Sequence, residues 1–102
     1  DIGKLFPDTS AEFKGIDSKI LLRRVCDVIN EKGYKISNID CTIAMQRPKL
    51  RHHIDLMRER LAEVVGITTD RISVKATTTE HLGFEGREEG VSATAATLLI
   101  KA

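Results

Sequence analysis

A run of threonines followed by an acidic residue is the part of this sequence best suited to chemistry. Residues 77–79 are all threonine, Glu80 follows directly, and the glycine-rich stretch 83–90 then carries Arg87. Hydroxyl and backbone donors can bind the oxygens of a diphosphate, an arginine can neutralise its charge, and a carboxylate can hold a bridging divalent cation. The pattern therefore indicates a diphosphate site. The alternative is a polar strand end followed by an ordinary flexible loop.

Two further loops could take part in the same site. Residues 1–9 form one of them, and residues 45–51 form the other, directly before a predicted helix. The free N–H groups and the dipole of a helix N-terminus favour an anion. Lys49 would be unfavourable there by about 0.3–1 kcal/mol without an anion, so its presence indicates anion binding only weakly.

The remaining reactive side chains favour structural roles. Adjacent residues of a helix do not share a face, so His52 and His53 cannot close on one metal ion without further ligands, and His81 is isolated. We interpret Cys26 and Cys41 as buried, reduced thiols of a cytoplasmic protein. We interpret the two adjacent acids at positions 88 and 89 as a solvated pair of loop charges.

Composition restricts the class of protein. The chain has 102 residues, a formal net charge of +1, 4% aromatic residues and no tryptophan. This balance supplies no field for nucleic acid or for an anionic membrane, and no platform for stacking bases. We see no signal peptide and no apolar run near the roughly 20 residues of a membrane span. A domain of this size has a thin core, so an oligomer interface could assist it.

Hydrophobic periodicity predicts the elements that position these loops. Residues 1–16 are predicted to be an ordered loop, and a helix capped by Asp17 or Ser18 is predicted to end at Gly33. A half-buried strand from residue 36, a helix over 54–64 that stops at Gly66, and a strand over 71–76 follow. The last run, 91–101, is predicted to be a long, well-buried strand. The whole chain is then one α+β domain, with one mixed β-sheet packed against two helices.

Three sequence segments together resemble a known enzyme family. These are DIGKLFPDT at residues 1–9, QRPK at 46–49, and KATTTE with LGFEGREEG across 75–90. They are similar, in order and from end to end, to the 2-C-methyl-D-erythritol 2,4-cyclodiphosphate synthases. The combination of DIGxxFPDT with TTTE…GFxGRxEG is highly specific for that family.

The resemblance implies an activity in non-mevalonate isoprenoid biosynthesis. The family converts 4-diphosphocytidyl-2-C-methyl-D-erythritol 2-phosphate into 2-C-methyl-D-erythritol 2,4-cyclodiphosphate and CMP. It forms homotrimers with active sites between neighbouring subunits. The 2-phosphate of the substrate attacks the β-phosphorus, so catalysis consists of positioning and of charge neutralisation by metals and fixed donors. The implied partners are a small cytidine diphosphate substrate and two further copies of the chain, with no nucleic acid and no membrane.

The resemblance also implies roles for individual residues. Asp1 and Gly3 match positions that hold ribose hydroxyls, and Thr78 matches the transition-state stabiliser. Glu80 matches the ligand of a magnesium or manganese ion that bridges the phosphates. The implied substrate-binding residues are Asp1, Ile2, Gly3, Phe6, Pro7, Asp8, Thr9, Ser10, Met45, Gln46, Arg47, Pro48, Lys49, Leu50, Arg51, Thr77, Thr78, Thr79, Glu80, Phe84 and Arg87.

Within that set, each segment has its own part of the substrate. The segment 6–10 matches the lining of the methylerythritol phosphate, and residues 45–51 match a loop that reads cytosine largely through backbone groups. Lys49 matches a lysine near the nucleotide phosphates, and residues 77–80 match the diphosphate clamp. Phe84 and Arg87 match positions near the phosphate end of the substrate and the central channel of the trimer.

The chain departs from the family at its zinc site. The family binds zinc through an N-terminal segment with an Asp-x-His pair and a third histidine, and none of these ligands is in this sequence. We therefore expect the domain to be N-terminally incomplete, residues 1–102 alone to be inactive, and the full-length protein to be active. Two alternatives stay open: a non-catalytic trimeric nucleotide-binding module, and an assembly domain that uses its last strand as a trimer face.

Overall fold

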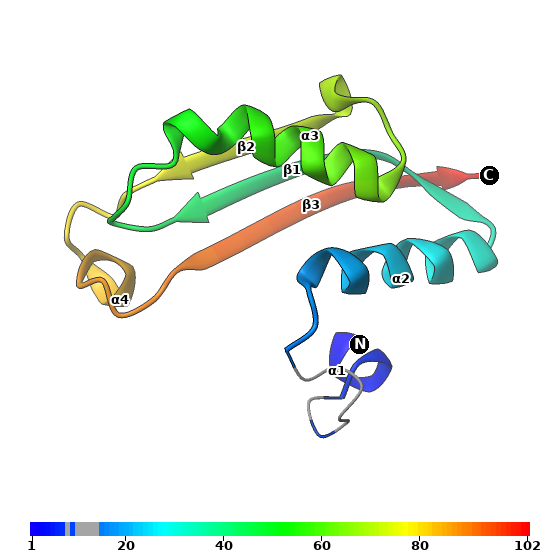
Figure 1. The fold of residues 1–102 in the computed structure, drawn as a ribbon, viewed down its shortest axis with the longest axis horizontal. Helices are drawn as coiled ribbons and strands as arrows, with labels where there is room; N and C mark the ends of the chain where they lie inside the picture. Colours follow the sequence, from blue (N-terminus) through cyan, green and yellow to red (C-terminus); the bar gives the residue numbers. More distant parts are fainter. Residues whose placement is uncertain (8, 10–14) are drawn as a thin grey trace.

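A mixed three-stranded sheet with two helices on one face forms the framework (Figure 1). The computed structural model describes residues 1–7, 9 and 15–102. Its elements are α1 (Ile2–Leu5), α2 (Ser18–Glu31), β1 (Tyr34–Ala44), the 3-10 helix η2 (Arg51–His53), α3 (Ile54–Val65), the 3-10 helix η3 (Thr69–Arg71), β2 (Ile72–Thr77), α4 (Gly83–Gly86) and β3 (Ser92–Lys101). The predicted α+β architecture is confirmed.

The sheet topology decides which loops meet. The strand order is β2-β1-β3, with β1 parallel to β2 and antiparallel to β3. Parallel strands need a crossover connection, and α3 supplies it. The parallel register ends at the pair Ala44 and Thr77, and the Met45 N–H donates to the Thr77 carbonyl at 3.0 Å. The loops after β1 and after β2 therefore leave the sheet side by side.

The helix boundaries follow local chemistry. Asp17 caps α2 by accepting the N–H of Lys19 at 2.8 Å, as predicted. α3 ends at Gly66, whose φ of 82° is a left-handed conformation that glycine adopts without strain. Within the described residues, no helix combines the length and the apolar character that crossing a membrane requires.

The core lies between the helices and the two parallel strands. α3 packs on β2, and α2 packs on β1 and beside α3. Ile39, Ala62, Ile72 and Val74 form the buried centre, and Ile72 is the most enclosed at 2% exposure. Cys26 is also buried and Cys41 is half-buried, and both are free thiols. Burial raises the pKa of each thiol.

The prediction that the last strand is well buried is wrong for the described chain. β3 lies at an edge of the described sheet, and Leu98 and Ile100 remain 55% and 38% exposed. The two long helices pack on β1 and β2 and leave β3 uncovered. Its apolar composition indicated burial but could not identify what would cover it.

Two short helices replace predicted loops. α1 forms in the segment expected to be an ordered loop, where the Asp1 carbonyl accepts from the N–H groups of Lys4 and Leu5. α4 forms in the stretch interpreted as flexible. Single helical turns carry no hydrophobic periodicity that a sequence pattern could reveal.

Candidate functional site

A cleft of about 600 Å³ opens where β1 and β2 end. Two of the three predicted loops form it, because the parallel register brings their starting points together. The residues that line it are Met45, Pro48, Lys49, Leu50, Arg51, His52, Ile54, Ala76, Thr77 and Thr78. The cleft therefore combines an apolar wall with basic groups and hydroxyls, which suits a nucleotide or another phosphorylated ligand.

The N-terminal turn of the crossover helix favours anion binding at one side of the cleft. No side chain caps η2 or α3, although the N–H of His53 donates to the Leu50 carbonyl at 2.8 Å. Lys49, just before that turn, and Arg51, the first residue of η2, line the cleft. Uncapped N–H groups and two cations at one boundary give the cleft a positive potential toward an anion.

The three threonine hydroxyls are not equivalent. The Thr77 hydroxyl donates to the Thr78 carbonyl at 3.0 Å, and the Thr79 hydroxyl donates to the Leu82 carbonyl at 2.5 Å. The Thr78 hydroxyl oxygen accepts the N–H of Glu80 at 3.4 Å and donates to none of the described residues. Since Thr78 is half-buried at the wall of the cleft, its hydroxyl proton is the one available to a ligand.

Glu80 suits a divalent cation only together with a ligand. It follows the clamp threonines in a left-handed conformation with φ 53°, and its side chain is exposed. No group of three or more histidine, cysteine, aspartate or glutamate residues in the described part of the chain could hold a metal ion. Magnesium commonly takes one or two protein carboxylates and completes its shell with phosphate oxygens and water. The carboxylate of Glu80 fits that pattern.

The segment after the clamp is compact. A Cβ atom added at Gly86 would lie 2.2 Å from the carbonyl carbon of His81, so only glycine allows α4 to pack on that backbone. Arg87 donates through Nε to Glu89 at 2.6 Å. Neither Phe84, which is 45% exposed, nor Arg87 lines the cleft.

The remaining predicted residues divide into three groups. Gln46, Arg47, Thr79 and Glu80 are neighbours in sequence of the lining residues but do not line the cleft themselves. Asp1, Gly3, Phe6, Pro7 and Thr9 precede α2 in the chain and do not line the cleft either, and Ile2 begins α1. Figure 1 shows α1 apart from the ends of β1 and β2. Asp8 and Ser10 lie outside the described residues.

Sequence reasoning missed the contacts that join the two loops. Arg47 donates to Glu88 through Nε at 2.6 Å and through Nη2 at 2.8 Å, and the Arg47–Pro48 peptide is cis. The hydrogen bonds and charge of Arg47 lower the pKa of Glu88, and Glu88 raises the pKa of Arg47 in return. Residues 88 and 89 are both exposed, as the sequence predicted, but each acid also pairs with an arginine, which the sequence did not reveal.

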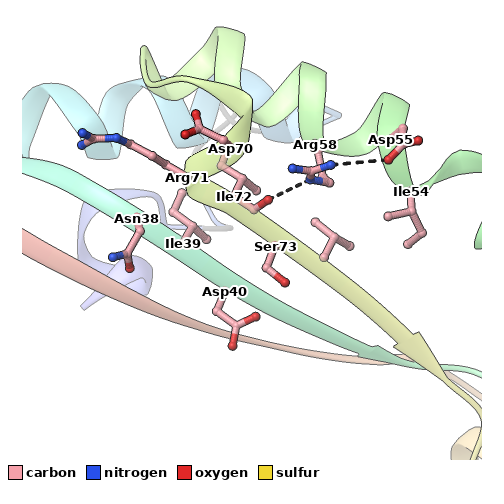
Figure 2. Close-up of a pocket in the computed structure, with 11 residues that line it drawn as sticks. Asn38, Ile39, Asp40, Ile54, Asp55, Arg58, Asp70, Arg71, Ile72 and Ser73 are labelled. Atoms are coloured by element: carbon pink, nitrogen blue, oxygen red, sulfur yellow. Dashed lines mark hydrogen bonds and ion pairs between the residues drawn. The ribbon is translucent and has the colours of Figure 1, made fainter.

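A second hollow, of about 540 Å³, lies along α3, η3 and β2 (Figure 2). Its most prominent cation, Arg58, donates to the backbone carbonyls of Ile72 at 2.8 Å and Thr69 at 3.0 Å. Its Nη1 also reaches Asp55 at 3.5 Å. The guanidinium of Arg58 therefore holds α3 to the start of β2. Because this cation is already engaged by protein groups, the hollow is a weaker candidate for ligand binding than the cleft.

Known proteins resemble the chain along its whole length. The YgbB family model matches residues 1–100. A Bacteroides thetaiotaomicron protein named 2-C-methyl-D-erythritol 2,4-cyclodiphosphate synthase is 58% identical over 99% of this chain and 64% of its own length. A protein of the same name from Ectopseudomonas mendocina is 56% identical over 100% of this chain and 65% of its own length.

Solved structures share the fold as well as the sequence. The CDP complex of IspF from Plasmodium falciparum is 34% identical, with a TM-score of 0.84 over 99% of this chain and 60% of that one. The bifunctional IspDF from Campylobacter jejuni is 42% identical, with a TM-score of 0.90 over 99% of this chain and 27% of that one.

The shared features run through the parts of the chain that build the cleft. The family match includes the loop after β1, the threonine clamp and the segment around α4. The chain spans 64–65% of the length of these two curated relatives. The chain therefore belongs to the YgbB family.

Proposed function

We propose that the protein containing this chain converts 4-diphosphocytidyl-2-C-methyl-D-erythritol 2-phosphate into 2-C-methyl-D-erythritol 2,4-cyclodiphosphate and CMP. The observation that carries the proposal is the cleft, which Lys49 and Arg51 line together with Thr78, whose hydroxyl donates to none of the residues that the structure describes. The names of the relatives favour a synthase over a nucleotide-binding module without chemistry.

The reaction needs no nucleophile from the protein. An oxygen of the 2-phosphate of the substrate forms a bond to the β-phosphorus, and the bond from that phosphorus to the α–β bridging oxygen breaks. CMP leaves with the electron pair of that bond. The protein has to hold the attacking and leaving oxygens in line and to stabilise the charge that develops on the phosphates.

The residues of the cleft divide this work. The Thr78 hydroxyl is placed to donate to a phosphate oxygen, and Lys49 supplies a compact positive charge for the nucleotide phosphates. The backbone of residues 45–51 takes the cytosine, while the half-buried Met45 and Leu50 supply apolar wall. Thr77 and Thr79 keep the clamp in shape through their bonds to backbone carbonyls.

The proposed activity also requires divalent metal ions. Glu80 would hold a magnesium or manganese ion, and zinc would be held by residues of the whole protein outside this chain. A bound divalent ion supplies Lewis-acid stabilisation of phosphoryl oxygens. We place the enzyme in the cytoplasm, where its free thiols would stay reduced.

The assembly is proposed to be a homotrimer with active sites between subunits. Two observations support this arrangement. The ribose-binding candidates Asp1 and Gly3 lie away from the cleft of their own chain, so a neighbouring subunit could supply them. β3 also leaves the apolar side chains of Leu98 and Ile100 exposed, as an interface strand would.

The test is CMP release from the cytidyl diphosphate substrate by the full-length protein, with and without a zinc chelator. We expect release that the chelator abolishes and that added zinc restores, because the metals supply much of the charge neutralisation. A full-length protein that binds CDP but releases no CMP would instead be a nucleotide-binding module.

Lys49→Met should weaken CDP binding by about tenfold, because a charge-assisted contact to phosphate contributes about 1.5–3 kcal/mol and part of it is screened by solvent. The effect should shrink at high salt. Isothermal titration of CDP into the full-length protein measures it. The matched control is Lys32→Met at the end of α2, an exposed lysine outside the cleft. Equal losses in the two variants would show that Lys49 makes no specific contact.

A further inference from the structure

The loop after β1 and the segment after β2 are joined by a forked ion pair. Arg47 Nε lies 2.6 Å from Glu88 Oε1, and Arg47 Nη2 lies 2.8 Å from Glu88 Oε2. Two parallel N–H···O bonds fix the orientation of both groups as well as their distance. The pair joins residues 41 positions apart in the sequence, so it holds two separate loops together.

A second contact joins the same two segments. The Gln46 side-chain oxygen accepts the N–H of His81 at 3.1 Å. Gln46 and Arg47, which are adjacent in one loop, therefore contact the two ends of the segment 81–88. That segment is internally packed, because Gly86 lies directly on the backbone of His81. A shift of Glu88 would therefore move His81 as well, and with it the adjacent Glu80 of the clamp.

One joined segment lines the cleft, and the other follows closely after a strand end that does. Pro48 and Lys49 follow Arg47 directly and line the cleft on one side. On the other side, Thr77 and Thr78 line it at the end of β2, two residues before Glu80. The bond from the Met45 N–H to the Thr77 carbonyl joins the starts of the two loops, and the contacts of residues 46 and 47 are the next ones along the chain that hold the loops together.

We propose that Arg47 and Glu88 are positioning residues, whose forked pair sets the spacing between the nucleotide-binding loop 45–51 and the diphosphate clamp 77–80. The inference rests on the proposed function, since it concerns ligands that span both elements. Two nitrogens of Arg47 are engaged by Glu88, so its guanidinium acts on the position of the loop.

The expected effect is modest. The Arg47 side chain is 74% exposed and that of Glu88 is 39% exposed, and exposed pairs are weakened by solvent and salt. We expect CDP affinity to fall about 3- to 5-fold when either partner is neutralised, which is the range that exposed ion pairs reach. Inorganic pyrophosphate occupies only the clamp, so its affinity should change less than twofold.

The experiment is a double-mutant cycle in the full-length protein. Arg47→Gln, Glu88→Gln and the double variant are titrated with CDP and with pyrophosphate, and CMP release is measured for each. We expect both single variants to lose CDP affinity by the same factor and the double variant to lose no more. The charge-swapped variant, Arg47→Glu with Glu88→Arg, should recover part of the loss. Arg60→Gln, which breaks an exposed pair with Glu63 on α3, is the matched control.

Other outcomes overturn the inference. A loss confined to Arg47→Gln, without recovery in the swapped variant, would show that Arg47 contacts the ligand directly. Additive losses, or unchanged CDP affinity in both single variants, would show that the pair does not set the spacing. These results are separate from failure of the proposed function, which would appear as absence of CMP release from the unmodified protein.

Discussion

Thr78→Ala is expected to lower kcat by about 100-fold while KM changes less than threefold. Removing one preorganised donor to a developing oxyanion costs about 10²–10³ in kcat. An interaction that strengthens as charge develops on the phosphates appears in kcat, whereas one made equally with the bound substrate appears in KM. Steady-state CMP release by the full-length protein separates the two quantities.

The structure supplies a reason to choose Thr78 among three adjacent threonines. The hydroxyls of Thr77 and Thr79 donate to the carbonyls of Thr78 and Leu82, respectively. Thr78 receives the N–H of Glu80 on its hydroxyl oxygen, which leaves the proton for a ligand and orients the side chain. The same bond connects Thr78 with Glu80, so the proposed phosphate donor and the proposed metal ligand lie in one turn.

Two further variants test this account of Thr78. Thr78→Val keeps the branched shape without the hydroxyl and should resemble Thr78→Ala. Thr78→Ser keeps the hydroxyl and should recover most of kcat. A rise in KM alone would make Thr78 a binding residue, and full activity in Thr78→Val would remove it from the mechanism and favour an assembly role for the domain.

Periodicity was sufficient to predict the framework. Ile39 and Cys41 alternate with polar residues, as do Ile72 and Val74, and each of these runs forms a strand with one face on the helices. Gly66 marked the end of α3 because glycine adopts the left-handed cap readily. These signals are local, and the helices and strands that they specify are local too.

The contacts of the site could not be read in the same way. The pairing of Arg47 with Glu88 depends on β1 and β2 being parallel neighbours, and register is a property of the assembled sheet. The three threonine hydroxyls likewise look identical in sequence, and only their different hydrogen-bond partners in the folded turn distinguish them. The apolar character of Leu98 and Ile100 predicted burial, yet both are exposed on the described chain, and what covers an edge strand lies outside any pattern within that strand.

Ile72→Ala is expected to lower the free energy of unfolding by about 2–5 kcal/mol, through lost transfer energy and the cavity left behind. Ile72 is 2% exposed and packs with Ile39, Ala62 and Val74 in a core of few fully buried residues. A typical domain has only about 5–15 kcal/mol in total, so the loss is a large part of its stability. Urea denaturation of the full-length protein, at one fixed protein concentration, measures it.

Graded controls separate the core from the surface. Ile72→Val should cost about 0.5–1.5 kcal/mol. Ile20→Ala on α2, where the side chain is 48% exposed, should cost less than about 0.5 kcal/mol. A loss at Ile20 equal to that at Ile72 would contradict the burial described for these two positions.

The same variant connects the core to the site. Ile72 begins the strand that ends at Thr77, and its carbonyl accepts the Arg58 side chain at 2.8 Å, a backbone contact that the alanine variant retains. The start of β2 should therefore stay tied to α3 while the core loosens around it. We expect the folded fraction of Ile72→Ala to keep a kcat within about threefold of the parent, because the clamp at the far end of β2 is held by its own hydrogen bonds. A kcat loss as large as that of Thr78→Ala in fully folded protein would mean that the clamp depends on core packing rather than on its local bonds.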